Sequence, residues 1–241
     1  MNSSLDFSQF KLTSATIEIR YDNAYILWDR AGLIWSEANL AWFGLKANQA
    51  EPNVTRFVIN DRFDVMVSLD RSHLIDTKPT SSLKEFIEHA PTFLNLVMDS
   101  LNINKLERIG FRLIYKKYFK DKDTAAGTII DSKIMTVPTN KIFNIQGKVL
   151  LPSYSFVWEG ESTAAQIMLK AVDRKIDFKV PVGLEDEIPP VHLTKYEVIY
   201  DIDYYTIKTV SRGQFNVKDW IEQAYHLIKR DSKNFMVLDH G

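Results

Sequence analysis

The sequence contains no cysteine, which excludes disulfide bonds, thiolate-held zinc or iron–sulfur sites, and a cysteine nucleophile. It also lacks an excess of either charge, because 30 lysines and arginines stand against 31 aspartates and glutamates, for a formal net charge of -1. That balance removes the general electrostatic attraction to nucleic acids and anionic membranes, although a local basic patch is compatible with it. The overall charge therefore indicates no particular class of binding partner.

Long apolar runs are missing as well. No segment reaches the ~18 uninterrupted apolar residues of a membrane-spanning helix. The N-terminal sequence MNSSLD has neither the basic nor the apolar part of a secretion signal. We therefore expect a cytoplasmic protein that has no membrane partner.

Motifs of the common enzyme classes are also absent: the sequence has no HExxH, GxSxG, Walker A or GxGxxG pattern. The five histidines show no spacing typical of metal ligands. We predict neither a metal site nor a cofactor, and the lack of a catalytic signature favours a protein that acts by binding.

What the sequence does contain is a 241-residue chain that is 45% hydrophobic, enough to bury a substantial core. Alternating apolar residues predict strands, and apolar residues three and four apart predict helices. Together they predict an α+β fold, with antiparallel strands and amphipathic helices on one face. The expected strands cover residues 11–21, 54–59, 63–75, 106–119, 149–158, 165–172, 174–180 and 196–207, and we expect 165–172 and 174–180 to form a hairpin through Asp173. The expected helices cover 23–43, 82–101 with Pro91 inside, and the segment after Asn216.

Two stretches share one pattern, a strand that leads into a capped amphipathic helix: residues 65–101 and 198–235. In the first, Ser82 and Glu85 have the spacing of a capping box; in the second, Asn216 fits the N-cap and Phe215 is placed to pack on Trp220 across it. This predicts two similar lobes, residues 1–120 and 149–241, packed as one unit and joined by an irregular loop over 121–148. Their sheets should then pair around an approximate two-fold axis. The alternative is that strand–helix units are simply common.

Three segments in order, residues 107–112 (ERIGFR), 200–205 (YDIDYY) and 220–226 (WIEQAYH), resemble a sporadically distributed, uncharacterised bacterial family that has only a provisional catalogue name. In that family an "rIGxR" strand precedes a late "DxDxY" strand and a final helix. The resemblance covers residues 54–235. It implies no activity, cofactor or catalytic residue, and its patchy occurrence suits mobile elements and defence or toxin-neutralising cassettes.

Charged residues alternate with apolar ones on two of the expected strands. If these two faces meet, Arg–Asp pairs with fork geometry organise a polar binding site; the alternative is a solvated face with ordinary cross-strand charge pairs. A metal-assisted phosphoesterase would use Asp201 and Asp203 with Mg²⁺ and would need a third oxygen ligand. The residues of the two faces are Arg108, Arg112 and Lys116 on the first strand and Glu197, Asp201, Asp203 and Tyr205 on the second.

Trp28, Trp35 and Trp42 are seven residues apart, so that on a helix they form one ridge. The ridge is either core or an exposed interface for a protein partner or a second copy of the chain. The basic cluster at Lys116, Lys117, Lys120 and Lys122 is interrupted by Asp121, which disfavours nucleic acid without excluding it.

We therefore expect a non-enzymatic protein–protein interaction module of a bacterial accessory or defence-type system, whose partner is a protein or a second copy of the chain. The candidate binding residues are Arg108, Arg112, Asp201, Asp203 and Tyr205, and the candidate interface residues are Trp28, Trp35 and Trp42. The metal-assisted phosphoesterase and the nucleic-acid-binding protein remain alternatives.

Overall fold

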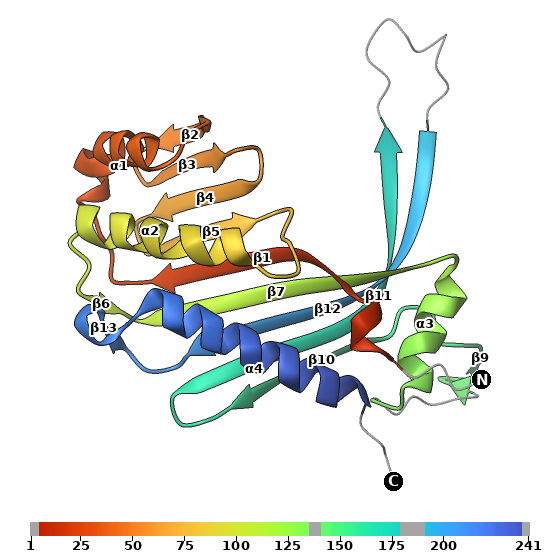
Figure 1. Cartoon of the computed structure of the whole chain (residues 1–241). Helices are drawn as coiled ribbons and strands as arrows, with labels where there is room; N and C mark the ends of the chain where they lie inside the picture. The colour runs from red at the N-terminus through yellow and green to blue at the C-terminus, as the bar shows by residue number, and fades with distance from the viewer. Residues whose placement is uncertain (1–4, 135–140, 179–190, 238–241) are drawn as a thin grey trace, which may run out of the picture.

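The computed structural model describes residues 5–134, 141–178 and 191–237. Its centre is a nine-stranded antiparallel sheet in the order β10-β11-β12-β7-β1-β5-β4-β3-β2 (Figure 1). The strands of this sheet are β1 (Lys11–Arg20), β2 (Leu45–Glu51), β3 (Val54–Ile59), β4 (Phe63–Ser68), β5 (Arg71–Asp76), β7 (Arg108–Phe119), β10 (Ser153–Glu159), β11 (Thr163–Phe178) and β12 (Val191–Thr206). The helices are α1 (Leu27–Ala41), α2 (Lys84–Ser100), α3 (Lys122–Asp131) and α4 (Val217–Val237). The predicted α+β class is confirmed.

Smaller elements complete the fold. β6 (Lys105–Leu106) pairs with β13 (Val210–Ser211), and β8 (Lys141–Ile142) pairs with β9 (Ile145–Gln146). Two 3-10 turns, η1 (Phe7–Gln9) and η2 (Arg212–Gln214), precede β1 and α4. None of the helices in the described residues is long and apolar enough to cross a membrane.

The four helices of the described residues pack on one face of the sheet, which we call the covered face. α1 contacts it through Trp35 on Phe57, α2 through Phe86 on Phe111, and α4 through Phe235 on Tyr200. α3 packs over β11 and β12. One row of paired residues that crosses this face reads Trp158, Ala165, Tyr204, Phe111, Ile17, Leu74, Val65 and Phe57.

The other face, which we call the open face, has no helix of the described residues on it (Figure 1). Because side chains alternate along a strand, the neighbouring row of paired residues points there. That row reads Glu159, Ala164, Tyr205, Gly110, Glu18, His73, Met66 and Arg56. One face of the sheet therefore forms the core, and the other carries charge.

The start of α4 follows its predicted cap. The side-chain oxygen of Asn216 accepts hydrogen bonds from the backbone N–H groups of Lys218, at 3.1 Å, and Asp219, at 3.3 Å. The rings of Phe215 and Trp220 lie 5.9 Å apart and pack across the cap. Both contacts are local, so the sequence alone specified them.

The predicted capping box at Ser82 does not form. Leu83, with a φ of 52°, precedes the first turn of α2 without a side-chain hydrogen bond, and Ser82 Oγ lies 3.5 Å from the backbone nitrogen of Lys84. Glu85 instead pairs with Arg62, which also binds the buried Asp76. The long-range ion pair thus takes the carboxylate that the local motif would have used. Pro91 lies inside α2, which continues as one helix.

The segment 121–148, predicted to be an irregular loop, contains α3. Asp121 Oδ1 accepts a hydrogen bond from the backbone N–H of Thr124 at 2.7 Å, which caps the helix. Ala125 and Ile129 are buried beneath it. The prediction was wrong because these few apolar residues lack a clear period by themselves, and their burial depends on β11 and β12.

Three strand predictions also need correction. Residues 63–75 form two strands, β4 and β5, because the chain turns at Leu69 and Asp70. Residues 165–180 were expected to form a hairpin through Asp173, but β11 runs straight through it as far as Phe178, where the described part ends. The polar stretch 46–53 contains most of β2, an edge strand that exposes both its faces and therefore needs no apolar alternation.

β1, the middle strand of the nine, and its neighbour β7 are antiparallel. β5, which leads toward α2, flanks β1, and β12, which leads toward α4, flanks β7. The predicted boundary at residue 120 falls just after β7, whose hydrogen bonds join it to both β1 and β12. The division into two lobes stays a prediction.

Two histidines give the fold a defined response to acid. Burial lowers the pKa of His73 on the open face, and it lowers the pKa of His89, whose Nδ1 accepts a hydrogen bond from Trp42 Nε1 at 3.0 Å. In the unfolded chain both histidines have their ordinary pKa of about 6.5, so near and below this pH the unfolded chain binds more protons than the folded protein does. Acid therefore favours unfolding. We expect the urea midpoint to fall between pH 7.5 and 5.5, and the double variant His73→Gln/His89→Gln to lose part of that fall. An unchanged pH dependence in this variant would contradict the assignment.

Candidate binding face

The two charged rows predicted from the sequence lie on neighbouring strands of the open face. β12 pairs with β7, so that Asp203 stands opposite Arg112 and Tyr205 opposite Gly110. The prediction that the acidic and basic rows lie side by side is therefore confirmed. Whether these residues bind a ligand is a separate prediction.

Arg112 forms a fork on Asp201. Its Nε donates to Oδ1 at 2.8 Å and its Nη2 donates to Oδ2 at 2.5 Å. Two parallel hydrogen bonds of this kind fix both the position and the orientation of a guanidinium. The neighbouring carboxylate raises the pKa of Arg112, so the guanidinium keeps its charge.

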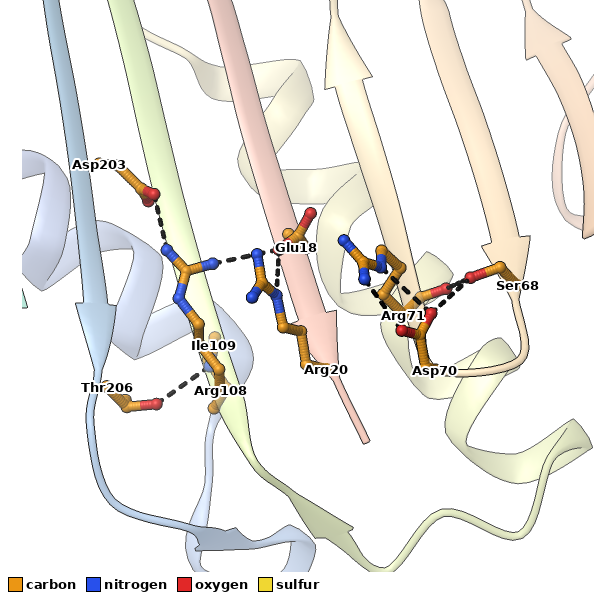
Figure 2. Close-up of polar contacts among 9 residues, drawn as sticks. All are labelled: Glu18, Arg20, Ser68, Asp70, Arg71, Arg108, Ile109, Asp203 and Thr206. Atoms are coloured by element: carbon orange, nitrogen blue, oxygen red, sulfur yellow. Dashed lines mark hydrogen bonds and ion pairs between the residues drawn. The ribbon is translucent and has the colours of Figure 1, made fainter. Parts of the chain in front are cut away.

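Arg108 bridges two strands, as Figure 2 shows. Its Nη2 donates to Asp203 on β12 at 2.6 Å, and its Nη1 donates to Glu18 on β1 at 3.1 Å. Arg20 Nε donates to the same Glu18 oxygen at 2.8 Å. The sequence-based site omitted Glu18 and Arg20, although both lie on the polar side of the predicted strand 11–21. The sequence did not show that β1 lies beside β7, and this pairing is what brings Glu18 and Arg20 to Arg108.

The aromatic and glycine residues around Arg108 explain its position. The Arg108 guanidinium carbon lies 4.3 Å from the centre of the Tyr205 ring, a cation–π contact. A Cβ at Gly110 would lie 2.8 Å from Arg108 Nη1, so the missing side chain leaves room for the arginine to lie across β7. The backbone N–H of Ile109 donates to Thr206 Oγ1 at 3.0 Å and ties the start of β7 to the end of β12. Tyr205 thus belongs to the cluster, as predicted.

A third charge pair lies further along the same strands. Lys116 Nζ is 3.2 Å from Glu197 Oε2, and Arg174 Nη2 on β11 is 3.6 Å from the same oxygen. Neither contact is a hydrogen bond to Oε2, so both are ion pairs. Glu197 is buried although it lies on the open face, because the long side chains of its cationic neighbours cover it.

In two ion pairs of this face the cation is much more exposed than the carboxylate. The Arg112 side chain is 48% exposed, whereas its partner Asp201 is 7% exposed. Arg174 is 50% exposed above Glu197, which is 1% exposed. At these two pairs the carboxylate lies beneath the more exposed cation, whereas Arg108, at 17%, is slightly less exposed than its partners Asp203, at 23%, and Glu18, at 21%.

Beside this cluster the surface forms a small depression, lined by Arg112, Gln166, Met168, Asp201 and Asp203. Its volume of about 100 Å³ is below the roughly 300–1,000 Å³ of small-molecule pockets. It could admit one side chain of a partner, but it could not enclose a nucleotide.

The arrangement gives little support to a metal site. Asp201 and Asp203 use oxygens to bind Arg112 and Arg108, and a cation would have to displace these arginines. Within the described parts of the chain, no group of three or more histidine, aspartate or glutamate side chains is placed to hold a metal ion. Mg²⁺ prefers several free oxygen ligands, so the arginine-paired carboxylates fit it poorly.

The three tryptophans do not form one ridge. Trp28 is 60% exposed and packs edge-on against Tyr25, and Trp35 is half-buried against Phe57. Trp42 follows the end of α1 in an extended conformation, and its ring is buried. The helix stops one residue before the third tryptophan, which breaks the predicted seven-residue spacing on a common face. An interface role for these residues stays a prediction, and exposure is compatible with it mainly at Trp28.

Comparison of the sequence with known protein families and with curated proteins finds no match. The resemblance to the uncharacterised bacterial family therefore stays a prediction, and the arguments about function below depend on the geometry of the open face.

Proposed function

We propose that this protein is a binding module, and that its open face binds an acidic segment of a protein partner. The observation that carries the proposal is the difference in exposure within two ion pairs: the nearly buried Asp201 and Glu197 lie beneath the half-exposed Arg112 and Arg174. The fork on Asp201 also holds Arg112 in one orientation. Fixed arginines lose little side-chain entropy when they bind a carboxylate. An acidic protein segment supplies such carboxylates.

The other features of the open face suit a protein partner better than a nucleic acid. Arginine and tyrosine are frequent at the energetic centres of protein interfaces. The depression next to Arg112 can admit one side chain beside the charged contact. The family resemblance adds a bacterial accessory or defence-type system as the proposed context.

Arg20 and Arg174 can each be replaced without leaving a carboxylate unpaired, so their replacement tests binding without disturbing the fold. Arg20 can be removed because Glu18 keeps Arg108, and Arg174 can be removed because Glu197 keeps Lys116. We expect Arg20→Gln/Arg174→Gln to weaken binding of a fluorescein-labelled Glu- and Tyr-rich peptide roughly tenfold, since each exposed charge contributes about 0.5–1 kcal/mol. Fluorescence anisotropy at low and physiological salt measures the change.

The matched control is Lys229→Gln/Arg230→Gln, which removes two exposed cations from α4 on the covered side of the sheet. It should leave peptide binding unchanged. Equal weakening by both double variants would mean that net charge, and not the open face, attracts the peptide. Tighter binding of single-stranded DNA of similar length, lost in Arg20→Gln/Arg174→Gln, would replace the protein partner by a nucleic acid and overturn the proposal.

A further inference from the structure

β10 forms one edge of the nine-stranded sheet, at its lower margin in Figure 1. Among the described residues it pairs only with β11. The outer side of such a strand presents backbone N–H and C=O groups that can pair with another strand. The two ends of β10 show which residues carry these groups.

The backbone of β10 alternates between its neighbour and the outside. The C=O of Pro152, just before the strand, accepts from Ala171 N at 3.0 Å, and Gly160 N, just after it, donates to Thr163 O at 2.9 Å. In an antiparallel ladder a residue points both of its backbone groups to one side, and successive residues alternate. Even-numbered residues therefore bond to β11, and the outward groups belong to Ser153, Ser155, Val157 and Glu159.

The opposite edge of the sheet is protected in ways that β10 is not. β2 has a register shift between Ala47 and Gln49, a lysine at position 46 and polar residues along its length. Bulges and lysines of this kind prevent unwanted pairing of edge strands. β10 pairs without a shift and reads SYSFVWE, with its only charge at the last residue. Val157 is 51% exposed and Trp158 is 74% exposed.

We propose that β10 pairs antiparallel with β10 of a second copy of this chain, around a two-fold axis at Phe156, and so joins two sheets into one. This register overlaps the whole strand and places the outward Ser155 opposite Val157 of the second copy. On the covered face it places Trp158 opposite Tyr154 of the second copy. Aromatic cross-strand pairs of this kind stabilise antiparallel sheets.

Charge complementarity favours a second copy as the occupant. In the proposed register Glu159 of one chain lies opposite Ser153 of the other, so no like charges face each other. Lys170 on β11 is the next residue beyond Ser153 on the same face. Serine is short, so the lysine can reach across it to the glutamate of the second chain. The same contact occurs twice, because a two-fold axis repeats it.

A proline at position 155 tests the interface. Ser155 points its N–H outward, so Ser155→Pro removes a donor of the proposed interface and leaves the bonds between β10 and β11 in place. Sedimentation equilibrium over a range of concentrations should show a reversible dimer for the wild-type chain and a dissociation constant at least tenfold higher for Ser155→Pro. Ser155→Thr keeps the N–H and should dimerise like the wild type. Circular dichroism establishes that each variant is folded.

A charge pair tests the register independently of proline. Ser155→Lys/Val157→Lys places lysines opposite each other across the proposed axis and should weaken the dimer. Ser155→Lys/Val157→Glu places lysine opposite glutamate and should restore it. Both positions are exposed on the open face, so neither variant disturbs the core.

The outcomes are decisive in both directions. A wild-type chain that stays monomeric at every concentration overturns the proposal, and so does a dimer with the same affinity in Ser155→Pro and Ser155→Thr. Equal dimerisation of the Lys/Lys and Lys/Glu variants overturns the register. The proposed peptide binding uses Arg20 and Arg174, neither of which is changed in these variants, so failure of one proposal leaves the other standing.

Discussion

Lys116→Met is expected to lower the free energy of unfolding by about 3 kcal/mol, because it leaves the carboxylate of Glu197 buried without its nearest cation. Glu197 is 1% exposed, and Lys116 Nζ lies 3.2 Å from its Oε2. The value lies at the lower end of the range for broken buried pairs, since Arg174 stays within 3.6 Å. Urea unfolding at neutral pH, followed by circular dichroism, measures the loss.

Two further variants separate charge from packing at this pair. Lys116→Met/Glu197→Met removes both charges and should recover much of the lost stability, because replacing a whole buried ion pair by apolar side chains is often neutral. Arg174→Gln should cost less than about 1 kcal/mol, because Arg174 is half exposed and the lysine remains. If the double methionine variant is no more stable than Lys116→Met, the loss comes from packing and the buried-charge explanation is wrong.

Trp42→Ala is expected to destabilise the protein by about 3–5 kcal/mol, the usual cost of removing a large buried aromatic side chain. Its ring is 5% exposed and its Nε1 donates a hydrogen bond to His89. Trp28→Ala should change stability by less than about 1 kcal/mol, because the Trp28 ring is mostly in solvent. Denaturation followed by circular dichroism avoids the tryptophan fluorescence that the substitutions alter.

This pair of variants also tests the ridge interpretation of the tryptophans. Three indoles on one face of a helix would share one environment, and their removal would have similar effects. The structure predicts a graded series instead, with Trp35→Ala between the other two because its ring is half-buried against Phe57. Equal losses for Trp28→Ala and Trp42→Ala would contradict the difference in burial between the two rings.

The sequence predicted those elements whose signal is local. In β1 and β7 the alternation of apolar and polar residues identified each strand and the face that meets the core. In α4 the cap at Asn216 and the packing of Phe215 on Trp220 were both correct. The predictions failed where a distant contact overrides the local pattern, as when Arg62 binds the carboxylate of Glu85.

The candidate site shows the same division. The sequence by itself determined that Arg108 and Arg112 share one side of their strand and that Asp201 and Asp203 share one side of theirs, because side-chain direction in a strand repeats every two residues. Only the tertiary structure decided that these sides meet and that Glu18 joins them. Arg112 and Asp201 are 89 residues apart in the chain, and Arg108 and Glu18 are 90 apart. No local period carries information over such distances, so strand order and register arise from packing of the whole sheet against its helices.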